Sequence, residues 1–212
     1  MRSPIFEITY ANYLRELSGV DLRSLESGLG RHHDGKSHTV SFFNKTCRIT
    51  REGITDLQGE LLPFDIRIVV LKYLLMCPGS VSIPHDWAAF RVIRGSAPLL
   101  GYFSHNVEEV LVNRFSGRTQ ALSEAAGKLG GYAPESEFPY DLSRCFNALP
   151  RVRLLMLFND ADDQFPAHCS VLLDTHSEAH LDPECLAIVA VRLARSLCES
   201  DEEGAPLWKE RS

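Results

Sequence analysis

Three carboxylates stand close together at Asp160, Asp162 and Asp163. Carboxylate oxygens at this spacing can coordinate a hard cation, or they can share a proton in acid–base catalysis. The spacing does not match an EF-hand, because no glycine stands at the turn and no glutamate closes the loop. The alternative is a solvated hairpin tip whose charge keeps the sheet from aggregating edge to edge.

A second polar group follows a strand-like run and comprises Asp174, His176, Glu178 and His180. If residues 176–180 (HSEAH) are helical, the two histidines share one helix face, as paired imidazole ligands of a metal do. The glutamate that zinc proteases carry directly after the first histidine is missing. The candidate ligands of a metal-dependent, hydrolase-like enzyme are then Asp162, Asp163, His176 and His180. The alternative is a helical turn whose polar groups cap and solvate the link to the last helix.

The segment WAAFR at residues 87–91 offers a different chemistry. Aromatic faces and a guanidinium group can hold a planar or anionic ligand by stacking and bidentate hydrogen bonds. The same side chains could equally anchor an irregular segment to the core. The candidate ligand-binding residues are Trp87, Phe90, Arg91, Asp162, Asp163 and Asp174. This interpretation requires the separate segments to meet at one cleft.

Other familiar chemistry is absent from the sequence. It contains no GxSxG, GxGxxG or GxxxxGK[ST] motif, so neither a serine nucleophile of that type nor a standard phosphate-binding loop is indicated. The six cysteines are scattered without a CxxC pair, which predicts mostly reduced and buried thiols instead of a metal site or a disulfide framework. His32 and His33, with Asp34 and His38, give a weak metal signal, for which a polar loop is the alternative. No cofactor is assigned.

The hydrophobic pattern shows which elements must position these groups. Residues 151–159 and 169–174 read as two antiparallel strands joined by the acidic loop, and residues 39–43 and 46–50 as a hairpin with its turn at Asn44-Lys45. Helices are predicted at residues 11–20, from Leu62-Pro63 to Pro78-Gly79, at 104–115 and 119–129, and from Asp182-Pro183 onward. The expected fold is α+β, a helical body packed on a small antiparallel sheet. Residues 1–198 are expected to form one domain, and residues 199–212 an acidic, flexible tail.

The composition excludes several classes of protein. The chain has 212 residues, of which 44% are hydrophobic, so it can bury a sizeable core and is not globally disordered. A formal net charge of −6, without a basic run, argues against nucleic acid as a partner and against an anionic membrane surface. The most apolar segment is interrupted by Asp65, Arg67 and Lys72, so no membrane span is expected. Without a signal peptide, the expected location is cytoplasmic.

Seven motifs occur in one order along the chain: VVLKYLL at 69–75, WAAFR at 87–91, Tyr102-Phe103, KLGG at 128–131, ALPRVRLLMLF at 148–158, DDQFPAHCSVLLD at 162–174 and HLDPE at 180–184. In this order they resemble a family of uncharacterised bacterial and archaeal domains, mostly from anaerobes, catalogued as a domain of unknown function. Some members carry a four-iron module of the kind found beside corrinoid proteins, but this chain lacks its cysteine run. Gln164 also replaces a family glutamate in the acidic loop.

The resemblance implies a shared fold and surface but no reaction. The sequence therefore favours a non-catalytic accessory module that binds a small molecule or a partner protein, with a place in anaerobic metabolism implied by the resemblance. The alternatives are the metal-dependent enzyme and a purely structural subunit. The residue types do not decide whether the chain is an enzyme.

Overall fold

Two antiparallel sheets and a set of helices make up the computed structural model, which describes residues 4–20, 38–50, 53–76 and 86–202. A three-stranded sheet has the order β1-β2-β3, and a four-stranded sheet has the order β4-β7-β6-β5. The strands are β1 (His38–Phe42), β2 (Lys45–Ile49), β3 (Ile54–Thr55), β4 (Trp87–Ala89), β5 (Leu142–Leu149), β6 (Val152–Asn159) and β7 (His168–Asp174). The α+β class is confirmed, with two sheets where the sequence had suggested one.

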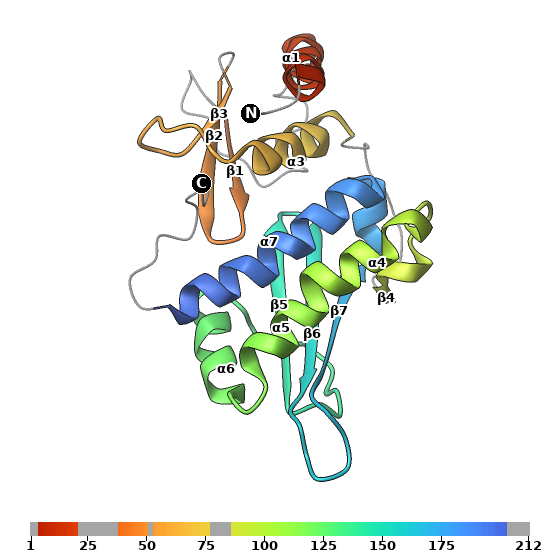
Figure 1. Ribbon diagram of the computed structural model, residues 1–212. Helices are drawn as coiled ribbons and strands as arrows, with labels where there is room; N and C mark the ends of the chain where they lie inside the picture. The colour runs from red at the N-terminus through yellow and green to blue at the C-terminus, as the bar shows by residue number, and fades with distance from the viewer. Residues whose placement is uncertain (1–3, 21–37, 51–52, 77–85, 203–212) are drawn as a thin grey trace.

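The helices lie mainly to one side of the four-stranded sheet. They are α1 (Pro4–Ser18), α3 (Phe64–Leu75), α4 (Leu100–Phe103), α5 (Glu109–Phe115), α6 (Thr119–Lys128) and α7 (Pro183–Asp201), with a π-helical turn at Ser104–Glu108 between α4 and α5. Figure 1 shows α5 and α7 crossing one face of this sheet. Among the described residues, no helix combines the length and the apolar character needed to cross a bilayer.

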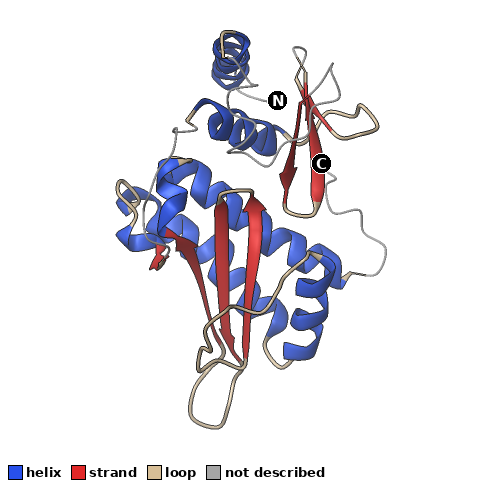
Figure 2. Ribbon diagram, turned by 180° about the vertical axis from the view of Figure 1, so that it is seen from behind, coloured by secondary structure: helices blue, strands red, loops and turns tan. Residues whose placement is uncertain are grey.

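Strand β6 is central in the four-stranded sheet and is apolar on both faces. Its side chains alternate, so that Leu154, Met156 and Phe158 join the main core, while Leu155 and Leu157 form a second cluster. The second cluster lies on the face turned away from α5 and α7, here called the outer face. Figure 2 shows the loop after α6 running across this face before it enters β5. Phe138 and Tyr140 of that loop pack on the second cluster and cover part of the outer face.

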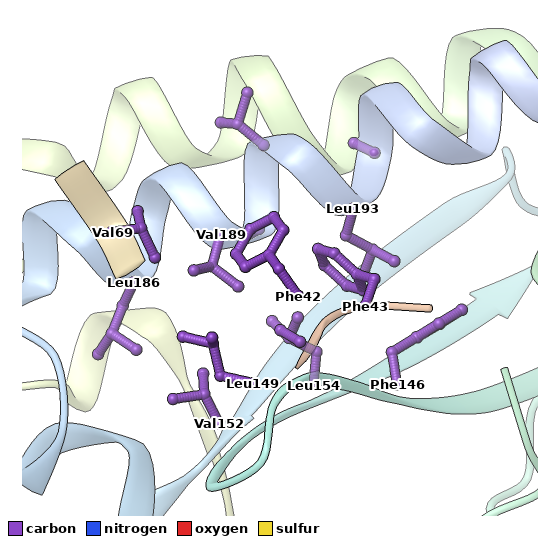
Figure 3. Close-up of a cluster of buried hydrophobic side chains, with 14 of the residues drawn as sticks. Phe42, Phe43, Val69, Phe146, Leu149, Val152, Leu154, Leu186, Val189 and Leu193 are labelled. Carbon is purple, nitrogen blue, oxygen red and sulfur yellow. The ribbon is translucent and has the colours of Figure 1, made fainter. Parts of the chain in front are cut away.

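Helix α7 connects the two sheets through its apolar stripe. Asp182 caps it by accepting the N–H of Cys185 at 2.9 Å, and proline occupies the first turn as the sequence predicted. Figure 3 shows Val189 and Leu193 of α7 beside Phe42 and Phe43 from the first hairpin. Burial of this stripe fixes α7 between the first hairpin and strands β5 and β6.

The end of α7 lies three residues beyond the boundary that we predicted after Cys198. The helix continues to Asp201, whose carboxylate accepts hydrogen bonds from Arg114 Nε at 2.8 Å and from Arg118 Nη1 and Nη2 at 2.9 and 2.8 Å. Arg118 above all lowers the pKa of Asp201, because hydrogen bonds from a guanidinium group stabilise the carboxylate. These long-range ion pairs hold the acidic end of the helix against α5 and α6.

The turn of the first hairpin lies one residue earlier than predicted. Phe42 pairs with Lys45, so the two turn residues are Phe43 and Asn44. Phe43, and not the asparagine, adopts the left-handed conformation, with φ of 49°. Its ring is 5% exposed and its N–H donates to the Ala148 carbonyl at 2.7 Å. Burial of the phenyl ring and docking on β5 therefore outweigh the turn preference of asparagine.

Gly130 ends helix α6 in a conformation that favours glycine. Its φ is +80°, and a Cβ at this position would lie 2.2 Å from Asn44 Oδ1. We expect Gly130→Ala to lower the free energy of unfolding by about 1–2 kcal/mol, since an L-residue is strained in the left-handed region.

Gly127 supplies the matched control within the same helix. A Cβ there meets nothing within 4 Å, so Gly127→Ala is expected to raise stability by about 0.5–1 kcal/mol. Urea denaturation of the two variants measures both effects. Equal changes in the two variants would contradict the assignment of strain to Gly130.

Candidate functional site

A polar row crosses the outer face of the four-stranded sheet at one end. Trp87 of β4 pairs with Asp174 of β7, and Asn147 of β5 pairs with Arg153 of β6. Because Leu154 pairs with Leu173, the same register places Arg153 directly beside Asp174. The alternation of the strands thus puts four polar or aromatic side chains on one face, next to the second apolar cluster.

Arg153 and Asp174 form the centre of this row. Both Nε and Nη2 of Arg153 donate to Oδ2 of Asp174, at 2.8 and 2.5 Å. The other carboxylate oxygen accepts the backbone N–H of His176 at 2.9 Å. The Asp174 side chain is only 2% exposed, whereas that of Arg153 is 29% exposed. Burial opposes the guanidinium charge, but the hydrogen bonds and the charge of Asp174 outweigh it and raise the pKa of Arg153.

Two aromatic side chains flank the arginine. The Arg153 Cζ lies 5.5 Å from the centre of the Trp87 ring, within cation–π distance. Tyr132 donates its hydroxyl to Asn147 Oδ1 at 3.1 Å and also hydrogen-bonds Arg153. The pKa of Tyr132 is raised, first by burial and then by Cys145, with Arg153 acting in the opposite direction. Trp87, Asp174 and Tyr132 together hold the guanidinium group in one orientation.

A cavity of about 270 Å³ opens beside this arginine. We call it the Arg153 cavity; its lining residues are Pro150, Arg151, Arg153, Asp174 and His176. Arg151 stands in the β5–β6 turn, and no described residue forms a hydrogen bond or ion pair with its guanidinium group. Because Asp174 is neutralised by Arg153, the charge of Arg151 makes the cavity electropositive.

The residues of the WAAFR segment divide between this site and other places. Trp87 reaches the polar row, but the Phe90 ring stacks on Phe103 at 4.3 Å and is 3% exposed, so it belongs to the core. Arg91 is exposed, and its charge acts on Glu108 of the π-helical turn. The guanidinium group beside Trp87 and Asp174 is therefore that of Arg153.

The acidic loop lies at the opposite end of the β6–β7 hairpin from Asp174. Since β7 separates them by seven residues, the distance is about 20 Å. Asp162 Oδ1 accepts the N–H groups of Gln164 and Phe165, both at 2.7 Å, and Asp163 is exposed. Asp162 and Asp163 thus do not meet Trp87 and Asp174 at one cleft.

Asp160 has a structural task in the same loop. Its carboxylate accepts the N–H of Gly117 and the hydroxyl of Thr119, both at 2.7 Å, at the start of α6. The Gly117 N–H is the main reason that the pKa of Asp160 is lowered. This carboxylate joins the hairpin loop to the helix.

The two histidines of the metal hypothesis do not share a helix face. Residues Thr175–Ala179 form a 3₁₀-helix, in which positions four apart point in different directions. His176 lines the Arg153 cavity, whereas His180 is 2% exposed and its ring lies 5.7 Å from that of Tyr73. Within the described ranges, no group of three or more His, Cys, Asp or Glu residues is placed to hold a metal ion. His32, His33 and Asp34 lie outside the described residues.

The described cysteines are free thiols. Cys47, Cys145, Cys169 and Cys185 are buried, and Cys198 is partly buried. Burial raises their pKa values, that of Cys47 to about 12 and that of Cys198 to about 11. A reactive thiolate needs the opposite shift, so these five side chains offer no activated nucleophile.

Sequence reasoning missed Arg151, Arg153 and Tyr132. The signal for Arg153 was its place as a charged residue within the apolar run RVRLLMLF, because such a residue on a central strand needs a partner. The hairpin register supplies Asp174 as that partner.

The fold and this row define an α+β domain with an electropositive cavity on the outer face of its sheet. The chain belongs to a family described as Domain of unknown function (DUF3786), whose model matches residues 21–196. Searches among curated proteins and among solved structures find no match to the chain.

Proposed function

We propose that this domain is a binding module that takes a small anionic molecule in the Arg153 cavity. The observation that carries the proposal is Arg151, a half-buried arginine that no described residue pairs and that lines a cavity beside a second, fixed arginine. A planar guanidinium group matches the geometry of a carboxylate or phosphate group, and pre-organisation reduces the entropy lost on binding.

The division of roles between the arginines supports binding in preference to acid–base catalysis. Asp174 is bound by Arg153 and by the His176 N–H, so its carboxylate serves to orient the arginine. Arg151 then supplies the charge that a ligand would meet. Arg151 and His176 also lie close enough to act electrostatically on His180, whose pKa is lowered mainly by burial.

The size of the cavity limits the ligand. Its volume of about 270 Å³ lies just below the range of about 300–1,000 Å³ that is usual for drug-sized ligands. The half-buried Trp87 near the arginine favours a ligand with a planar group. A small aromatic or unsaturated carboxylate fits this chemistry. A cytoplasmic location accords with the free thiols, and the part in anaerobic metabolism stays a prediction from the family resemblance.

Titration with benzoate, acetate and inorganic phosphate at constant ionic strength tests the proposal. Isothermal calorimetry of the wild type is expected to show saturable binding, with benzoate tighter than acetate. Arg151→Met should weaken benzoate binding by about 10–100-fold, because a charge-assisted hydrogen bond contributes about 1.5–3 kcal/mol.

Arg91→Met is the matched control, since it removes the same charge from an exposed position outside the cavity. Its affinity should equal that of the wild type. If none of the three anions binds the wild type, or if Arg151→Met binds them as well as the wild type does, the proposed function is wrong.

A further inference from the structure

Arg67 of helix α3 is a buried arginine without a polar partner. Its residue exposure is 8%, and its Nε is buried without a hydrogen bond. Throughout the described part of the chain, no carboxylate, carbonyl or hydroxyl group pairs with its guanidinium group. Arginines are seldom buried unless they are paired, so this position calls for an acceptor.

Two aromatic rings contact the guanidinium group from one side. The Arg67 Cζ lies 4.8 Å from the centre of the Tyr10 ring and 5.1 Å from that of Phe64. The two ring centres are 5.6 Å apart, a spacing that is too short for rings on opposite sides of the guanidinium plane. The rings support the cation but give its buried Nε no acceptor.

A second polar atom at this place also lacks a partner. Tyr10 is 6% exposed, and its hydroxyl is buried without a hydrogen bond. The backbone approaches it closely at Gly53, where an added Cβ would lie 3.2 Å from the hydroxyl. A phenol hydroxyl and a guanidinium group on neighbouring side chains are both donors to an oxyanion.

The nearest acidic residue along α3 pairs with another arginine. Asp65 accepts a hydrogen bond from Arg192 Nε at 2.6 Å and a second one from Arg192 Nη2. It therefore holds α7 against α3 and does not neutralise Arg67. The contrast between the paired Arg192 and the unpaired Arg67, two buried arginines of one core, points to an acceptor from outside the described chain.

We propose that Arg67 and Tyr10 form a second anion site, which takes a carboxylate or phosphate group between α1 and α3. The site is made by elements other than those of the Arg153 cavity; Figure 1 shows α1 and α3 beside the three-stranded sheet, away from β4. The aromatic rings cover one side of the guanidinium group, whose Nε is buried, and this low-dielectric surrounding strengthens its attraction for an anion.

The test uses the Arg151→Met protein, in which the Arg153 cavity is expected to bind anions about 10–100-fold more weakly and so to contribute little. Acetate and inorganic phosphate are added separately, with sodium chloride at matched ionic strength as the reference. The melting temperature of this protein is expected to rise by about 5 °C at about 100 times the Kd, because an anion that binds only the folded state stabilises it. The anion with the lower Kd identifies which group the site takes.

Adding Arg67→Met should abolish this rise, whereas adding the matched control Arg15→Met, an exposed arginine of α1, should leave it unchanged. Tyr10→Phe is the milder variant, and it should weaken anion binding by about 3–10-fold through the loss of one hydrogen bond. An equal response with and without Arg67 would overturn the site. Absence of any response in the Arg151→Met protein would do so as well, while the difference in calorimetric affinity between the wild type and Arg151→Met decides the proposed function separately.

Discussion

Replacing Arg153 with methionine is expected to abolish anion binding in the Arg153 cavity and to lower the free energy of unfolding by about 3 kcal/mol at pH 7. The variant removes both guanidinium hydrogen bonds from Asp174, whose side chain is 2% exposed. A hydrogen bond from the His176 N–H carries no full positive charge and does not by itself neutralise a buried carboxylate. The lower end of the usual range is expected, since Arg153 itself is 29% exposed.

Urea denaturation of Arg153→Met, Asp174→Asn and the double variant measures this effect as a double-mutant cycle. The double variant should be more stable than the sum of the two single losses predicts, because it leaves neither charge without its partner. The benzoate titration of the same proteins measures anion binding in the Arg153 cavity. Additive losses would contradict a coupled pair, and retained benzoate affinity in Arg153→Met would show that the arginine does not form the binding wall.

The elements that follow from short-range chemistry were predictable. Asp182 followed by proline marks the start of α7, and the Gly130-Gly131 pair marks the end of α6. The strands β6 and β7 and the long loop between them also agree with the predicted hairpin. Each of these signals acts within a few residues, so the sequence alone carries it.

Strand β5 was not predicted, because its register in the sheet decides its structure. Its residues Leu142–Leu149 include Arg144 and Asn147 among apolar side chains, a mixture without a clear alternating pattern. Pairing with β6 and the bulge near Asn147 allow this mixed sequence to form a strand, because its buried residues still reach the core. A single strand read without its neighbour does not show this.

The candidate site, too, could be predicted from the sequence only in part. Trp87 and Asp174 were selected for their chemistry, and the register of β4 and β7 does bring them together. Their partner Arg153 comes from β6, and only the pairing of three strands places it there. Asp162 and Asp163 lie at the opposite end of the same hairpin, because the full length of the strands separates the acidic loop from Asp174. Sequence patterns identify functional residue types, whereas long-range pairing decides which of them meet.

Acid is expected to destabilise the protein through His180. Its ring is 2% exposed, and its pKa is lowered to about 4, first by burial and then by the charges of Arg151 and His176. A histidine in the unfolded chain titrates near pH 6.5. Between about pH 6.5 and pH 4 the unfolded chain therefore binds a proton that the folded chain does not bind. Stability is therefore complete above pH 6.5 and falls as the pH drops. At pH 4 the loss from this residue amounts to about 3 kcal/mol.

His180→Leu isolates this contribution, since leucine fills the space beside Tyr73 but does not titrate. Chemical denaturation at pH 7 and at pH 4 should show a loss of stability on acidification that is about 3 kcal/mol smaller for His180→Leu than for the wild type. His105→Gln is the control: that side chain is exposed at the helix surface, where it contacts Glu109, and its removal should leave the acid loss nearly unchanged. An equal pH dependence of stability in the wild type and in His180→Leu would mean that burial does not lower the pKa of His180.

The Arg151→Met protein gives a second, smaller prediction for the same imidazole. The positive charge of Arg151 is absent there, so the loss of stability on acidification should be modestly smaller than in the wild type, although His180 is intact.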